Sequence, residues 1–139
     1  MLPHSELATA LETGDLVQAK ELLAAHPEML NSVEWTPPPL HCAVLADQLE
    51  IAEQLLEMGA DIELRDPDRG TTPLRYAVVY CNLPMIEMLM EKGANVGPIE
   101  EEGTTALELA LAGADGAFEE YDDLPAKGEF LKVVELLSR

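Results

Sequence analysis

Residues 70–95 read GTTPLRYAVVYCNLPMIEMLMEKGAN, two apolar segments of helical length that open with Thr-Thr-Pro and close with Gly-Ala-Asn. Pro73 stands at a helix start, where its missing N–H costs nothing. Thr72 before it is a favourable N-cap residue. Gly93 directly follows Lys92, a combination typical of a helix end. The stretch therefore predicts a turn followed by two helices that are joined by a short link.

The same unit recurs along the chain with a period of 33 or 34 residues. A leucine stands at Leu7, Leu40, Leu74 and Leu107, and an alanine follows three residues after each of them. A pair of helices cannot bury both of its faces alone, whereas stacked neighbours can. The period therefore predicts an all-α solenoid of four stacked helix–turn–helix units with short projecting loops.

Several segments carry a family signature. The segments PPPLHCAV (37–44), TTPLRYAV (71–78) and TTALELAL (104–111) resemble the Thr-Pro-Leu-His-x-Ala motif of ankyrin repeats. The segments LEIAEQLLEMGADIE (49–63) and LPMIEMLMEKGANV (83–96) are similar to that family's second helix and its Gly-Ala-Asp close. The first unit lacks the motif and the last lacks its proline. The resemblance implies one ankyrin-repeat domain over residues 1–139, with repeats near 4–33, 34–66, 67–99 and 100–139.

The fourth repeat departs from the pattern through an insertion between its two helices. Ala77 and Met85 are eight residues apart, whereas their counterparts Ala110 and Val133 are twenty-three apart. The fifteen extra residues fall within 113–130, a segment rich in Gly, Ala and acidic residues, which favours a loop. Such a loop either carries function on a rigid scaffold or is a tolerated insertion, and the sequence leaves both readings open.

The charge balance is the strongest compositional feature. Asp and Glu number 27 against 8 Lys and Arg, a formal net charge of -19. Phosphate contacts need clustered basic residues, so nucleic acid and anionic membrane surfaces are disfavoured as partners. A basic protein partner would be attracted, although the charge also serves solubility alone. The absence of a signal-peptide pattern at the start and of a long apolar run predicts a cytoplasmic protein, and like charge predicts a monomer.

Reactive side chains are few, and their spacing does not indicate catalysis. His41 and Cys42 are neighbours, so on a helix their side chains point about 100° apart and cannot form a nucleophile–base pair. Cys81 aligns with the glycine of the interhelix turn. The acidic runs at 100–102 and 119–123 lack the alternating spacing of a calcium loop. The sequence therefore predicts no enzyme, no cofactor and no metal site.

The resemblance implies a binding surface made of the loops between repeats and of the inner helices. Carried over by register, the loop residues are Glu34, Trp35 and Pro37, then Asp68, Arg69 and Thr71, then Glu101, Glu102 and Thr104. The helix side contributes Thr13, Leu45, Ala46, Val79, Tyr80, Ala112 and Gly113.

Two aromatic residues in this set, Trp35 and Tyr80, are typical of binding hot spots when they are exposed. Trp35 could equally pack under the Pro37–Pro39 run. An aromatic centre with an acidic rim suits a basic, partly apolar protein surface. We therefore predict a non-catalytic protein-binding module. The alternative is an acidic decoy that masks the nucleic-acid-binding surface of another protein, and an enzyme built on the insertion has no identifiable nucleophile.

Overall fold

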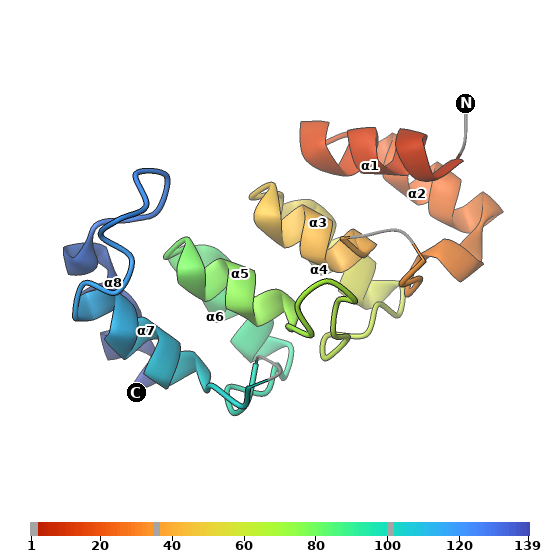
Figure 1. Ribbon diagram of the computed structural model, residues 1–139. Coiled ribbons are helices and arrows are strands. Elements are labelled where there is room, and N and C mark those ends of the chain that lie inside the picture. Colours follow the sequence, from red (N-terminus) through yellow and green to blue (C-terminus); the bar gives the residue numbers. More distant parts are fainter. Residues whose placement is uncertain (1–2, 35–36, 100–101) are drawn as a thin grey trace. The chain divides into compact units, whose positions relative to one another are not determined.

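The computed structural model describes residues 3–34, 37–99 and 102–139 (Figure 1). It divides into two compact units, residues Met1–Pro73 and Leu74–Arg139, which are described separately. Within the described ranges the regular elements are helical, and the β-type pairing is limited to an isolated antiparallel bridge between Pro98 and Thr105. The fold is all-α, as the repeat period predicts.

The first unit holds two helix pairs. They are α1 (Pro3–Thr13) with α2 (Leu16–Ala25), and α3 (Pro39–Leu45) with α4 (Leu49–Glu57), and a short 3₁₀ turn, η1 (Pro27–Met29), follows α2. Helix α1 packs on both α2 and α3, and α3 packs on α4. Neighbouring repeats in this unit therefore stack through their first helices.

The second unit holds the other two pairs. They are α5 (Pro73–Val79) with α6 (Leu83–Glu91), and α7 (Ala106–Ala114) with α8 (Lys127–Leu137). Helix α8 packs on α7 and also contacts α6. The inner side chains Met85, Ile86, Leu89 and Phe130 have no exposed surface.

The repeat is visible in the hydrogen bonds at the turn between the two helices of each of the first three pairs. The carbonyl groups of Ala10, Ala43 and Ala77 accept from the N–H five residues later, each at 2.9 Å. The residue before each donor has a positive φ: 85° at Gly14, 58° at Asp47 and 52° at Cys81. A left-handed residue ends the first helix and turns the chain into the second, so the alignment of Cys81 with glycine is confirmed.

Proline opens α3 and α5, as the sequence indicates, but the expected Thr72 cap is not formed. The side chain of Thr72 is buried, and its hydroxyl oxygen makes no hydrogen bond within the described residues. In α7 the cap is complete, because Thr105 and Glu108 exchange side-chain-to-backbone hydrogen bonds of 3.1 and 3.2 Å. This reciprocal pair satisfies two backbone donors that a helix start otherwise leaves open.

A long segment connects the two helices of the fourth repeat. Helix α7 ends at Ala114 and α8 begins at Lys127, so a loop of residues 115–126 separates them. The ring of Phe118 packs on that of Phe130 with centroids 5.6 Å apart. Glu119 and Lys127 form an ion pair of 3.3 Å across the loop. The loop is therefore anchored to α8.

Candidate protein-binding surface

The loop that follows α4 is closed by its own hydrogen bonds. The N–H of Asp66 donates to the Thr71 carbonyl (3.0 Å), and the N–H of Gly70 donates to the Asp66 carbonyl (2.9 Å). One carboxylate oxygen of Asp66 accepts from the N–H (2.8 Å) and the hydroxyl (3.0 Å) of Thr71. Gly70 has a φ of 64°, which glycine adopts without steric cost. This closure leaves Asp68 and Arg69 exposed at the tip.

The side chain of His41 in α3 is hydrogen-bonded to this loop. Its imidazole is fully buried, and Nε2 donates to the Thr71 carbonyl at 2.9 Å. Burial lowers the pKa of His41 below its usual 6.5, and the Thr71 carbonyl and the Asp66 carboxylate oppose that shift only in part. A neutral ring is therefore favoured, and the structural role expected for His41 is confirmed.

The loop that follows α6 closes in the same way. The N–H of Ile99 donates to the Thr104 carbonyl at 2.8 Å, and Ile99 is fully buried. Glu102 is exposed and Thr104 is half-buried, whereas Glu101 lies outside the described residues. Two successive loops thus have a closed stem, and Asp68 and Arg69 of the first and Glu102 of the second are exposed.

The first loop is only partly described. Glu34 and Pro37 are exposed, and the N–H of Glu34 donates to the Ser32 hydroxyl at 3.2 Å. Trp35 lies outside the described residues, so the choice between a binding and a packing role stays open. The side chain of Asn31 connects this region to the next repeat. Its N–H donates to the Gly59 carbonyl (3.2 Å), and its oxygen accepts from the Asp61 N–H (2.7 Å).

The remaining residues of the predicted surface differ in exposure. Tyr80, which follows the last residue of α5, is 42% exposed, whereas Val79 before it is only 5% exposed. Thr71 is 2% exposed, because its polar groups close the loop. Gly113 is buried against Phe130. Within the described ranges, the exposed residues of the predicted set are therefore Thr13, Glu34, Pro37, Leu45, Asp68, Arg69, Tyr80 and Glu102.

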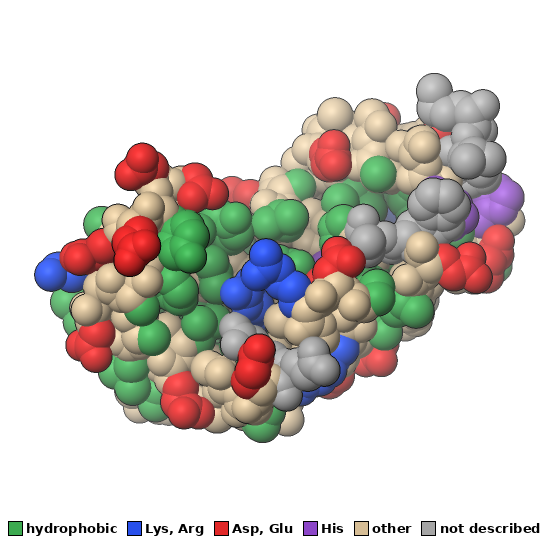
Figure 2. Space-filling view, viewed as in Figure 1, with side chains coloured by type: hydrophobic (Ala, Val, Ile, Leu, Met, Phe, Trp, Pro, Cys, Tyr) green, Lys and Arg blue, Asp and Glu red, His purple; other side chains and the backbone are tan. Residues whose placement is uncertain are grey.

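Acidic side chains dominate the charged surface that Figure 2 shows. The red groups are spread over many elements, and the blue groups are fewer, in line with 27 acidic against 8 basic residues. Such an excess attracts cationic partners over a distance of about 10 Å at moderate ionic strength.

The reactive side chains occupy structural positions. Cys42 is buried, and burial raises the pKa of its thiol to about 11. Burial also raises the pKa of Cys81 to about 11, with a smaller contribution from the charge of Glu129. A high pKa leaves little thiolate near neutral pH, which is the opposite of an activated nucleophile. Within the ranges that the structure covers, no group of His, Cys, Asp and Glu side chains could hold a metal ion.

The family profile described as ankyrin repeats (many copies) matches residues 40–89. The chain is an ankyrin-repeat protein. Human ankyrin repeat and SOCS box protein 6 is 36% identical over 104 residues, which is 73% of this chain and 25% of the relative. Chicken NF-kappa-B inhibitor alpha is 39% identical over 88 residues, 63% of this chain and 26% of the relative. Human palmitoyltransferase ZDHHC13 is 26% identical over 107 residues, 77% of this chain and 17% of the relative.

The chain spans about a quarter or less of the length of these relatives. Ankyrin repeats generally mediate protein–protein interaction, and the family is typically non-catalytic. Among the described helices of this ankyrin-repeat protein, none is long and apolar enough to cross a membrane.

Two features of this ankyrin-repeat protein could not be predicted from its sequence. The contact between Gly113 and Phe130 joins residues on either side of the insertion, and no local pattern pairs them. The pocket beside α1 is lined by residues far apart in the chain, among them His4, Met29 and Cys42.

Proposed function

We propose that this ankyrin-repeat protein is a non-catalytic binding module for a basic protein partner. Its exposed contact residues are Glu34, Asp68, Arg69, Tyr80 and Glu102, and Trp35 and Glu101 belong to the same proposed set. Thr71, Val79 and Thr104 would support these contacts from beneath the surface. The observation that carries the proposal is the closed stem of the loop after α4, which holds charged side chains on a rigid base.

Rigidity matters because binding costs free energy whenever loops must become ordered. Buried hydrogen bonds from Asp66 and His41 fix the loop before a partner arrives, so less free energy is lost on association. Tyr80 adds a large exposed ring, a residue type enriched among binding hot spots. The acidic residues would act mainly on the association rate.

The net charge of -19 favours a second candidate, an acidic decoy that masks a basic, nucleic-acid-binding surface. One relative is named as an inhibitor of NF-kappa-B, which is consistent with a role in occupying another protein. A decoy would bind through charge alone, so its affinity would fall steeply with salt and would not depend on Tyr80.

Affinity measurements distinguish the two functions. The partner is first captured on the immobilised protein and then purified for these measurements. Wild type, Tyr80→Ala and the matched control Tyr121→Ala, which removes an exposed tyrosine from the insertion, would be compared at about 50 and 500 mM salt. We expect Tyr80→Ala to raise the Kd about fivefold or more and Tyr121→Ala to leave it unchanged. An unchanged Kd for Tyr80→Ala, with binding lost at high salt, would refute the module and support the decoy.

The acidic residues require a separate kinetic measurement. Asp68→Ala and Glu102→Ala are expected to lower the association rate and to leave the dissociation rate nearly unchanged, because exposed charges at a rim steer the encounter. Surface plasmon resonance with the same partner measures both rates. A change confined to the dissociation rate would mean that these residues do not act by steering.

A further inference from the structure

The fourth repeat exposes apolar side chains whose counterparts in the first and third repeats are buried. Leu111 of α7 is 46% exposed. Its counterparts four residues after the repeat leucine, Leu11 and Val78, are 2% and 0% exposed. Leu107, one turn before Leu111, is half-buried, whereas its counterpart Leu74 is 1% exposed. One side of α7 is therefore uncovered where the equivalent side of earlier helices is covered.

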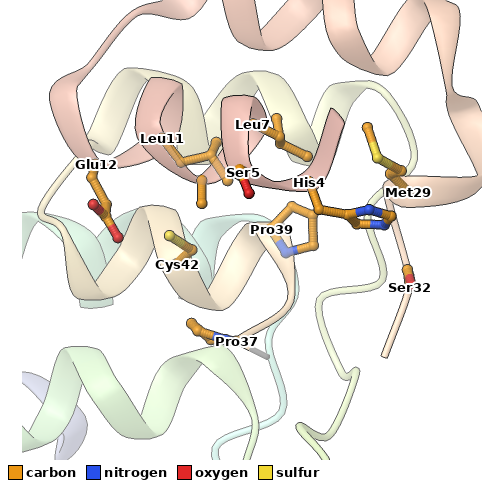
Figure 3. A pocket seen from close by; sticks show the side chains of 11 residues that line it. His4, Ser5, Leu7, Leu11, Glu12, Met29, Ser32, Pro37, Pro39 and Cys42 are labelled. Carbon is orange, nitrogen blue, oxygen red and sulfur yellow. The ribbon is translucent and has the colours of Figure 1, made fainter. Parts of the chain in front are cut away.

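The first repeat shows which element covers this side. Leu7 and Leu11 of α1 line a pocket beside α3, which is the first helix of the next repeat (Figure 3). Pro39 and Cys42 of α3 line the same pocket, and α1 packs on α3. In the second unit, α8 of the fourth repeat contacts α6 of the third. The side that is uncovered on α7 is thus the side on which a following repeat stacks.

Helix α8 extends the uncovered side. Val134 and Leu137 are half-buried. Their counterparts in the third repeat, Ile86 and Leu89, have no exposed surface. Leu131 stands three residues before Val134 on the same side of the helix and is 60% exposed. We call this apolar side of the fourth repeat the end face, and it consists of Leu107, Leu111, Leu131, Val134 and Leu137.

The first repeat does not offer a matching apolar side to cover the end face of a second copy. Thr9 and Thr13 are exposed on one face of α1. Thr9 stands at the register position at which the second and fourth repeats have the buried residues Cys42 and Leu109. A polar side of this kind does not bury apolar surface, so head-to-tail stacking of two copies is disfavoured.

Acidic residues flank the end face and indicate the charge of its occupant. Asp115 stands four residues after Leu111, and Glu135 stands four residues after Leu131, so each lies about one turn from an exposed leucine. Both acidic residues are exposed. Two copies of a chain with a net charge of -19 repel each other, whereas a cationic partner is attracted. The charges therefore favour a basic partner over a second copy.

We propose that the end face binds an amphipathic helix of a basic protein partner, in the position that the following repeat occupies on earlier helix pairs. The apolar side of that helix would cover Leu111 and Leu131. Lys or Arg residues at its margins would pair with Asp115 and Glu135. This surface is separate from the loops and Tyr80 of the proposed function, so each surface can fail its test without the other.

The probe is a synthetic peptide of about 18 residues, or five helical turns, made of Leu, Ala and Lys with the leucines along one side. A peptide with Glu in place of every Lys is the charge control. Isothermal titration calorimetry with the full chain at about 0.15 M salt measures both affinities. We expect the Lys peptide to bind and the Glu peptide not to bind. The NMR methyl signals of Leu111 and Leu131 should shift during the titration with the Lys peptide.

Leu111→Gln and Leu131→Gln test the location of the binding site. Glutamine keeps a long side chain and a good helix propensity but removes apolar contact. Each variant should raise the Kd of the Lys peptide about fivefold or more. Leu45→Gln is the matched control, because Leu45 of α3 is 45% exposed and lies outside the end face. This control and Tyr80→Ala should leave the Kd unchanged.

The proposal is wrong if the Lys peptide does not bind, if both end-face variants keep the wild-type Kd, or if Leu45→Gln weakens binding equally. Equal binding of the Glu peptide would also contradict it. Circular dichroism verifies that each variant is folded, and either end-face variant suffices if the other misfolds. Sedimentation equilibrium tests the chain alone. A dimer that dissociates on the Leu111→Gln substitution would assign the end face to a second copy and overturn the proposal.

Discussion

Gly113 of α7 lies directly against the ring of Phe130 of α8. A Cβ atom on Gly113 would be 2.5 Å from the Cγ atom and 2.7 Å from the Cε1 atom of that ring. Phe130 is fully buried, and its ring also packs in a tilted arrangement on that of Phe118 in the insertion. The close approach of the two helices therefore depends on a glycine at this position, and α8 anchors the inserted loop through the same ring.

Replacing Gly113 by alanine should destabilise the protein. A methyl group at this site must displace a buried ring, and overpacking of this kind costs about 1–3 kcal/mol. Gly128→Ala is the matched control, because a Cβ there meets nothing within 4 Å and alanine favours the helix. Urea denaturation measures both free energies of unfolding, and equal effects for the two variants would contradict the contact.

Asp66→Ala should open the loop that follows α4. Asp66 is buried, and its removal leaves the Thr71 N–H without its carboxylate acceptor. A buried donor that loses its partner costs about 1–3 kcal/mol. Thermal unfolding should therefore show a lower Tm, and hydrogen exchange at Thr71 should accelerate. The exposed acid Asp123 provides the control, since Asp123→Ala should change stability by no more than about 0.5 kcal/mol.

The stability of the protein should fall as the pH drops below 6.5. The pKa of His41 is lower in the folded state than its usual 6.5, so the unfolded state binds more protons in this range. The stabilisation is complete above pH 6.5 and is lost as the pH falls through the folded pKa. Denaturation between about pH 5 and 6.5, above the usual range of carboxyl groups, isolates this contribution.

His41→Gln should remove that part of the pH dependence. His26→Gln should retain it, because His26 lies half-buried at the end of α2 and does not contact the loop after α4 through any described hydrogen bond. If His41→Gln kept the wild-type slope, protonation of another group would be responsible.

Alkylation of Cys81 should be slow at neutral pH and should keep accelerating up to about pH 11. The thiolate is the reactive form, and burial raises the pKa of Cys81 to about 11. A Cys42→Ala variant leaves Cys81 as the sole thiol, so its rate with iodoacetamide can be followed by mass spectrometry. A plateau near pH 9 would show that the thiol has its usual pKa.

Much of the fold follows from local sequence. The spacing of Leu7, Leu40, Leu74 and Leu107 predicts the repeats, and helices begin at Pro39 and Pro73 where the signature places them. These features depend on neighbours along the chain, such as proline at a helix start, so a linear pattern encodes them.

The candidate site was less predictable. Register locates the loop residues Asp68 and Arg69, which are exposed, but it cannot separate Tyr80 from the buried Val79 beside it. Thr71 is buried because Asp66 binds both its N–H and its hydroxyl. The exposure of a side chain depends on which groups form the hydrogen bonds that close the loop. The repeat pattern does not specify those hydrogen bonds.

The sequence by itself determined the helical repeat, its period, the position of the insertion and the excess of negative charge, since each is a property of residue order or composition. The tertiary structure decided the close contact of Gly113 with Phe130, the anchoring of the insertion through Phe118, and the pocket beside α1. Each of these depends on whether two side chains far apart in the chain fill the same space, and close packing settles that only after the helices have come together.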